Sequence, residues 1–136
     1  MRLLSLMLLV LLAGCSGNSN QPEFGILHPV SGTITLGGNP VKGGTIQLNL
    51  EPDNTEFLIN SEVSDSGKFE LTTVRTTDSS GERKKGVAPG TYKVTYLPNL
   101  NDQTAGYREP VVLPKPVVIE AKENILSLEL PLKPSR

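Results

Sequence analysis

Residues 29–52, PVSGTITLGGNPVKGGTIQLNLEP, hold two runs in which apolar and polar side chains alternate, separated by the turn sequence GGNP. The apolar members of the two runs are Val30, Ile34, Leu36, Ile46, Leu48 and Leu50. Alternation with a period of two puts one face of a strand in the core and the other in water. It is typical of antiparallel sheets, because strands of parallel sheets are usually apolar on both faces. This stretch therefore predicts two strands of an all-β domain.

The same alternation recurs along the chain, so we expect about seven strands forming an antiparallel Greek-key β-sandwich. The further strands are expected in residues 57–63, 67–71, 91–97, 110–118 and 124–132. In the Asp-Ser-Gly turn at 65–67 we expect Gly67 to adopt a positive φ. Pro114 and Pro116 should place their segment on a sheet edge, or divide it into two short strands. The predicted core residues are Leu48, Leu71, Val94 and Leu128, with Gln47, Glu70, Lys93 and Glu129 facing solvent. In the last expected strand the alternation runs through Leu126, Leu128, Leu130 and Leu132.

The N-terminus has the layout of a bacterial export signal. Arg2 supplies a positive charge, residues 3–12 are mostly apolar, and the small residues Ala13 and Gly14 precede Cys15. A helix over the apolar run would span about 15 Å at 1.5 Å per residue, roughly half of the ~30 Å hydrocarbon core of a bilayer. A permanent transmembrane helix is therefore not expected here.

The tetrapeptide Leu12-Ala13-Gly14-Cys15 resembles the lipobox of bacterial lipoproteins. The resemblance implies a diacylglyceryl group on the Cys15 thiol, cleavage just before this residue and acylation of the new N-terminus. Two or more acyl chains hold a protein firmly to a membrane, whereas one holds it only marginally. The alternative is a free cysteine in an ordinary signal peptide, and an intrachain disulfide is excluded because Cys15 is the only cysteine.

These features divide the chain into three parts. Residues 1–14 are the expected signal peptide, residues 15–26 the lipidated cysteine with a flexible polar tether, and residues 27–136 a β-sandwich domain. We expect an exported protein that is lipid-anchored to the cell envelope, facing the periplasm or the outside. A serine rather than an aspartate follows Cys15, and in many two-membrane bacteria this resembles a signal for the outer membrane.

A second resemblance concerns the domain. The segments VSGTITLGGNPVKGGTIQLNLEP, SDSGKFEL and GVAPGTYKVTY occur in this order between Pro29 and Pro98. In order and spacing they are similar to carboxypeptidase regulatory-like domains, which are prealbumin-like or transthyretin-like β-sandwiches. A last strand up to Pro131 fits the same pattern. These motifs are turn and core positions, so the resemblance implies a fold and, in most members of the family, a non-catalytic module.

The sequence predicts no catalytic residue, no metal site and no cofactor. Transthyretin-like hydrolases use more than one histidine with an arginine, whereas this chain has only His28. The acids Glu51, Asp53 and Glu56 lie in a loop that lacks the fixed alternation of a calcium-binding loop. A small hydrolase, or an accessory protein in carbohydrate processing, is the alternative function that we retain.

The basic stretch Arg83-Lys84-Lys85 is the candidate partner-binding site, in a long polar loop expected between Val74 and Gly86. Deletion of residues 79–85 is accordingly expected to leave the fold intact. The formal net charge is −1 and the pI is about 5.8, so no nucleic-acid partner is expected. We expect a membrane-anchored binding or structural module, held by Cys15, whose partner is an envelope protein or a polysaccharide.

Overall fold

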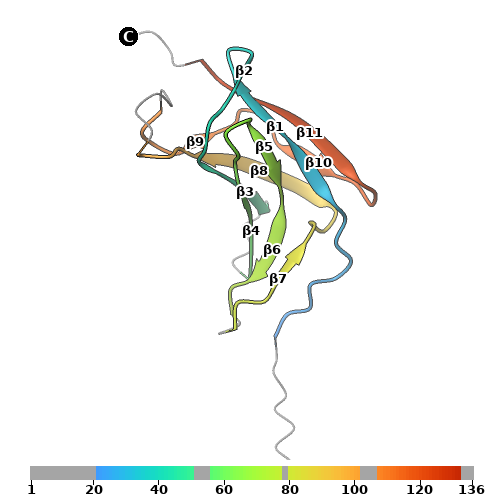
Figure 1. Ribbon diagram of the computed structural model, residues 1–136. Coiled ribbons are helices and arrows are strands. Elements are labelled where there is room, and N and C mark those ends of the chain that lie inside the picture. Colours follow the sequence, from blue (N-terminus) through green and yellow to red (C-terminus); the bar gives the residue numbers. More distant parts are fainter. Residues whose placement is uncertain (1–20, 51–55, 78–79, 102–106, 133–136) are drawn as a thin grey trace, which may run out of the picture.

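The chain forms a sandwich of two β-sheets in a computed structural model that describes residues 21–50, 56–77, 80–101 and 107–132 (Figure 1). These residues contain eleven strands and no helix. The expected all-β sandwich is confirmed, and each of the seven expected strand regions contains at least one strand. Within the same ranges, no helix is long and apolar enough to cross a membrane.

The larger sheet has seven strands, and all of its pairs are antiparallel. Its order is β10-β8-β3-β4-β6-β7, with β9 also pairing with β8. The strands are β3 (Thr45–Leu50), β4 (Phe57–Glu62), β6 (Thr72–Arg75), β7 (Arg83–Lys85), β8 (Gly90–Leu97), β9 (Val111–Val112) and β10 (Val117–Ile119). The strands β3 and β4 lie in the middle of this order, and β7 ends it on one side.

The smaller sheet has four strands and mixed directions. They are β1 (Val30–Leu36), β2 (Asn39–Pro40), β5 (Lys68–Glu70) and β11 (Asn124–Leu130). β2 and β5 pair antiparallel with β1, but β11 runs parallel to β1 from Val30↔Asn124 to Leu36↔Leu130. The expectation of purely antiparallel pairing is therefore wrong for this pair. The chain crosses from β10 in one sheet to β11 in the other, and this crossover lets the last strand run in the direction of the first.

One continuous stretch of chain belongs to both sheets. β5 pairs with β1 in the smaller sheet, and β6, which begins two residues later, pairs with β4 in the larger one. Between them, the Leu71 amide donates to the carbonyl oxygen of Val30 at 2.8 Å, and the Leu71 carbonyl accepts from the amide of Gly86 at 3.0 Å. Leu71 itself is fully buried. This residue joins the two sheets at a corner of the sandwich, as is common where strands switch sheets.

The core lies between the sheets and follows the register predicted from the sequence. The predicted residues Leu48, Leu71, Val94 and Leu128 are buried. Leu130, in the same alternation as Leu128, is buried as well, and Leu126 packs partly buried against the core. Glu70 and Glu129 are exposed, and Gln47 and Lys93 are partly exposed. Leu132 is 73% exposed, so the expected alternation does not continue to this residue. It follows Pro131, beyond the end of β11, where no partner strand keeps the alternation in place.

The turns and one edge are also as expected. Gly67 has a φ of 75° in the turn before β5. Pro114 and Pro116 separate two short strands, β9 and β10, which both pair with the outer side of β8. This edge is therefore broken by prolines, which cannot donate ladder hydrogen bonds.

Candidate functional site

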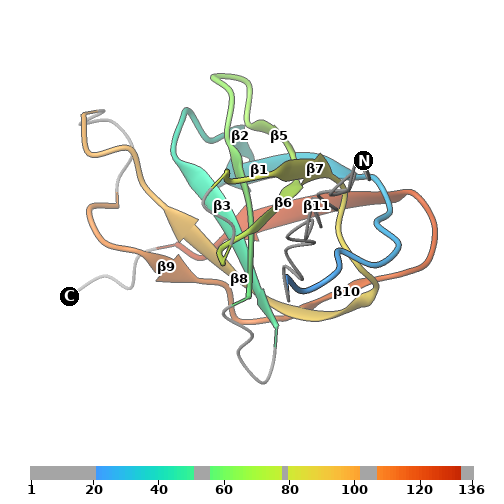
Figure 2. The same cartoon turned by 90° about the horizontal axis from the view of Figure 1, so that it is seen from below.

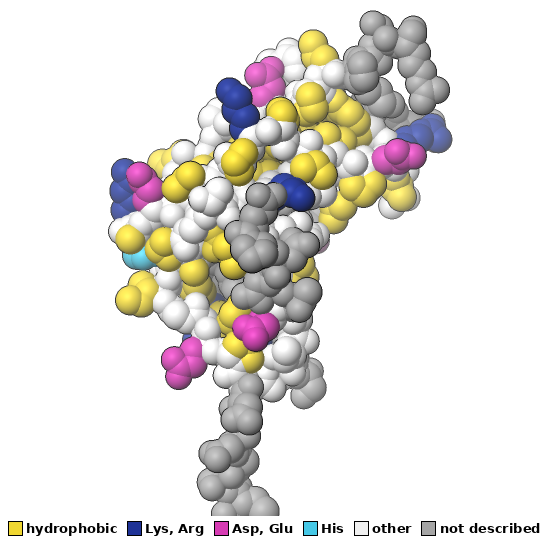
Figure 3. Space-filling model, turned by 180° about the vertical axis from the view of Figure 1, so that it is seen from behind, with side chains coloured by type: hydrophobic (Ala, Val, Ile, Leu, Met, Phe, Trp, Pro, Cys, Tyr) yellow, Lys and Arg dark blue, Asp and Glu magenta, His cyan; other side chains and the backbone are white. Residues whose placement is uncertain are grey.

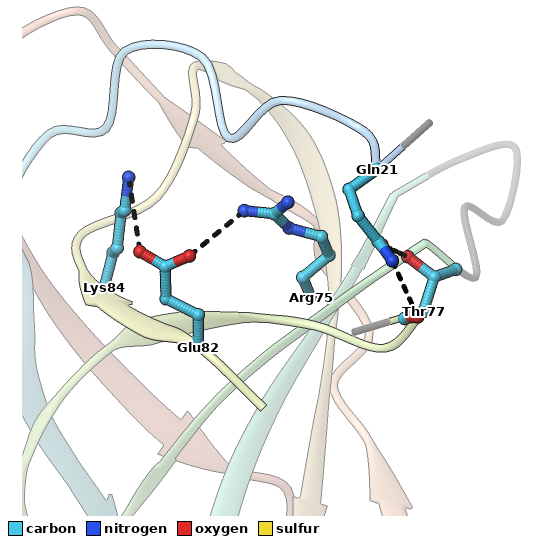
Figure 4. A network of polar contacts seen from close by, with 5 residues as sticks. All are labelled: Gln21, Arg75, Thr77, Glu82 and Lys84. Atoms are coloured by element: carbon cyan, nitrogen blue, oxygen red, sulfur yellow. Dashed lines mark hydrogen bonds and ion pairs between the residues drawn. The ribbon is translucent and has the colours of Figure 1, made fainter. Parts of the chain in front are cut away.

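Residues 21–29 precede β1 and form the N-terminal segment, which is fastened to the end of the sandwich. The side-chain amide Nε2 of Gln21 donates to the carbonyl oxygen of Thr77 at 3.2 Å, and the Thr77 hydroxyl donates back to Gln21 Oε1 (Figure 4). Further along, His28 and Val87 exchange two backbone hydrogen bonds of 2.9 Å. Viewed from below, the segment runs across the end of the sandwich (Figure 2). Residues 21–26 were expected to belong to the flexible tether, but these contacts hold them against the domain.

Phe24 is the centre of this attachment. It is only 8% exposed, and its ring centroid lies 5.5 Å from that of Phe57 on β4. The guanidinium carbon of Arg75 and the Nζ of Lys84 each lie 4.6 Å from the Phe24 centroid. Glu82 holds both cations, with Oε2 at 3.2 Å from Arg75 and Oε1 at 3.8 Å from Lys84 (Figure 4). The attachment therefore combines apolar burial with cation–π contacts.

The predicted basic loop is a strand. Arg83, Lys84 and Lys85 form β7, which pairs with β6 through Thr72↔Lys85, Thr73↔Lys84 and Val74↔Arg83. All three side chains are exposed, so the stretch lacks the alternation by which strands are recognised in a sequence. The prediction of a loop here is wrong for this reason. An edge strand with both faces in water can be entirely polar, and lysines are common on such edges.

The charged groups of β7 have partners. Arg83 Nη1 donates to Oδ1 of Asn60 at 2.9 Å and also to the Thr72 hydroxyl. Lys85 Nζ lies 3.8 Å from Oε1 of Glu70. A deletion of residues 79–85 would remove this strand and with it Lys84, whose ammonium group contacts the Phe24 ring. We therefore no longer expect that deletion to leave the fold intact.

A shallow groove lies over the outer face of the smaller sheet, next to the β4–β5 connection, and has a volume of about 680 Å³. Its lining includes Ser31, Thr33, Ser61, Lys68, Glu70 and Ile125. The Ser61 hydroxyl accepts a hydrogen bond from the Glu70 amide at 3.1 Å and donates to the carbonyl oxygen of Glu62 at 2.8 Å. The lining carries hydroxyls, an ammonium group and carboxylates, but most of its exposed surface is apolar, and Val63, Phe69 and Ile125 belong to it.

A smaller apolar cavity of about 160 Å³ lies under the N-terminal segment. Phe24 and Leu27 cover it, and Leu48, Phe57, Ile59 and Tyr92 form much of its wall. The Tyr92 hydroxyl donates to the carbonyl oxygen of Ala88 at 2.7 Å, and burial raises the pKa of this phenol. The cause of the raised pKa is thus the burial of Tyr92 in the fold. The cavity belongs to the attachment of the N-terminal segment, because Phe24 and Leu27 line it.

The other residues singled out in the sequence are not brought together. His28 takes part in the fold through its backbone, opposite Val87. Glu56 is exposed, whereas Cys15, Glu51 and Asp53 lie outside the described residues. Within the described part of the chain, no three histidine, cysteine or acidic side chains are placed to hold a metal ion. Phe24 was missed because a single aromatic residue in a polar stretch carries no periodic signal.

Comparisons with protein families, with curated proteins and with solved structures give no match to this chain.

Proposed function

We propose that the protein is a lipoprotein of the bacterial cell envelope, with its lipid on Cys15, and that its sandwich is a non-catalytic binding module. The tetrapeptide Leu12-Ala13-Gly14-Cys15, which resembles a lipobox, supports a lipid anchor on Cys15. The two-sheet architecture and the motifs between Pro29 and Pro98 support a domain of the carboxypeptidase regulatory-like kind. Such a domain binds through a sheet face or its loops rather than in a deep pocket.

The observation that carries the binding role is the open groove over β1 and β5. A groove of about 680 Å³ with a largely apolar lining, which also carries hydroxyls and groups of both charges, suits a polymer that presents apolar ring faces as well as hydroxyl groups. Each hydrogen bond to such a ligand contributes about 1 kcal/mol, so several must act together. We therefore propose an envelope polysaccharide as the ligand and the groove as its site.

The test is retention of the detergent-purified full chain on polysaccharide isolated from the envelope. Thr33 is exposed on the groove face of β1, and Thr91 is exposed on β8 in the other sheet. Thr33→Arg places a bulky side chain in the groove and should weaken retention about tenfold, the equivalent of 1.4 kcal/mol. Thr91→Arg adds the same charge elsewhere and should leave retention unchanged.

Equal retention of the two variants would contradict binding in the groove. A second measurement separates the groove from the basic strand β7. Binding through Arg83, Lys84 and Lys85 to an anionic polymer would fall steeply with added salt. Retention that is salt-sensitive, lost in Lys85→Ala and unchanged in Thr33→Arg would assign the ligand to β7 instead.

A further inference from the structure

We infer that the attached N-terminal segment fixes which end of the domain faces the membrane, namely the end formed by β6, β7 and Thr77. The inference rests on the proposed lipid anchor at Cys15. Its other support is independent of the anchor and consists of the contacts of Gln21 and Phe24 with the sandwich. The partner surface is the bilayer itself.

The length of the chain limits the distance between the anchored Cys15 and the first residue that is attached to the domain. Six residue steps separate Cys15 from Gln21. A chain extends by at most about 3.3–3.6 Å per residue, so Gln21 stays within about 20 Å of the anchored cysteine. Without the attachment, the first fixed residue would be near His28, thirteen steps from Cys15, and the reach would be about 45 Å. The contacts therefore shorten the tether by more than half.

The attachment point is at one end of the molecule. Gln21 binds Thr77, which follows β6, and Phe24 lies against Arg75 of β6 and Lys84 of β7. In Figure 1 this end lies opposite the end that carries β2. A short tether fastened at the β6–β7 end holds that end near the lipid head groups and directs β2 away from them.

Charge does not provide this orientation. Arg75, Arg83, Lys84 and Lys85 lie at the β6–β7 end, together with Glu23, Glu56, Glu70 and Glu82. Among the described residues of this end, four cations and four carboxylates leave no net charge to attract anionic lipids. Charges of both signs are also interspersed on the face shown in Figure 3. Because attachment rather than attraction sets the orientation, it should persist at high salt.

The experiment measures energy transfer from a dye on the domain to acceptor lipids in vesicles of phosphatidylethanolamine and phosphatidylglycerol. The full chain is purified from bacterial membranes and reconstituted, with one new cysteine as Lys85→Cys on β7 or Asn39→Cys on β2; both positions are exposed. Lipid on the thiol of Cys15 prevents this residue from taking the dye. We expect transfer to be at least twofold greater from position 85 than from position 39, in low and in high salt.

Phe24→Ala supplies the decisive variant and Ile26→Ala its control. Both residues belong to the N-terminal segment, but Phe24 is 8% exposed and Ile26 is 77% exposed. Phe24→Ala should release the segment and reduce the difference between the two dye positions, whereas Ile26→Ala should preserve it. Hydrogen exchange of the core strands confirms that each variant is folded.

Two negative results are distinguishable. Equal transfer from the two positions in the membrane-bound protein, or a difference that Phe24→Ala leaves unchanged, would overturn the fixed orientation while the anchor stands. Dye found on Cys15 itself would show an unmodified thiol, and the proposed lipoprotein would fail together with the orientation that rests on it.

Discussion

The guanidinium carbon of Arg75 lies 4.6 Å from the centre of the Phe24 ring, and this contact joins the N-terminal segment to the larger sheet. The Arg75 side chain is only 14% exposed and also binds Glu82 at 3.2 Å. A cation–π contact sheltered from water in this way contributes up to about 2 kcal/mol. Residues 21–29 are thus part of the folded domain rather than an appendage to it.

Phe24→Ala should lower the free energy of unfolding by about 3 kcal/mol, near the lower end for buried aromatic residues, because the site lies at the rim of the core. The ring loses its contacts with Phe57, Arg75 and Lys84 together. Urea denaturation of the Cys15→Ser form, in which no lipid interferes, measures the change. Ile26→Ala is the control and should cost less than about 0.5 kcal/mol. Similar costs for the two substitutions would show that the segment is not attached.

Gly44→Ala should be far more destabilising than Gly38→Ala. Both glycines have similar positive φ values, 87° and 81°, so both substitutions incur the strain of an alanine in that conformation. A Cβ at Gly44 would lie 2.5 Å from the Tyr96 hydroxyl and 2.6 Å from the Leu97 carbonyl oxygen, whereas Gly38 has open space.

The clash would also displace the Tyr96 hydroxyl from the Gly43 carbonyl oxygen, to which it donates at 2.9 Å. We therefore expect Gly38→Ala to cost about 1 kcal/mol and Gly44→Ala at least 2 kcal/mol more. Thermal melts of the two variants give the comparison. Equal losses of stability in the two variants would mean that the chain at the start of β3 adapts to the added methyl group.

Tyr92→Phe tests a pH dependence. Burial raises the pKa of Tyr92 in the folded state, so the unfolded chain, with an ordinary value of about 10, loses its proton first as pH rises. The contribution of the neutral phenol to stability is present below about pH 10 and is lost as pH rises through the folded pKa. The wild-type protein should therefore lose free energy of unfolding more steeply than Tyr92→Phe above that pH.

At neutral pH the same variant leaves the Ala88 carbonyl oxygen without its 2.7 Å hydrogen bond and should cost about 1–2 kcal/mol. Denaturation curves at a series of pH values measure both effects. Parallel stability curves for the two proteins would refute the assignment of this pH dependence to Tyr92.

The strands were predictable where one face is buried and the other is wet. In β1, β3 and β8 the packing of the core repeats every two residues, and the sequence shows that period directly. The direction of β11 was not predictable, because Leu128 and Leu130 pack on the same face whether the strand runs parallel or antiparallel to β1. Pairing direction depends on the route of the chain between the sheets, and local alternation does not encode that route.

The candidate site was only partly visible in the sequence. Arg83-Lys84-Lys85 stood out as charged. Its strand structure comes from backbone pairing with β6, and this pairing does not depend on the type of the exposed side chains. Phe24 gave no signal because its burial depends on Arg75 and Phe57, residues distant in sequence. The groove over β1 and β5 could not be predicted, since Thr33 and Lys68 become neighbours only once the two strands have paired.

The most direct measurement is the intact mass of the chain extracted from the membranes of a bacterial host that processes lipoproteins. A lipoprotein should begin at Cys15 and carry a diacylglyceryl group and an added acyl chain, and Cys15→Ser should leave the membrane fraction or retain residues 1–14. Extraction of a chain that begins at another residue, or of one that begins at Cys15 with an unmodified thiol, would contradict the proposed lipoprotein.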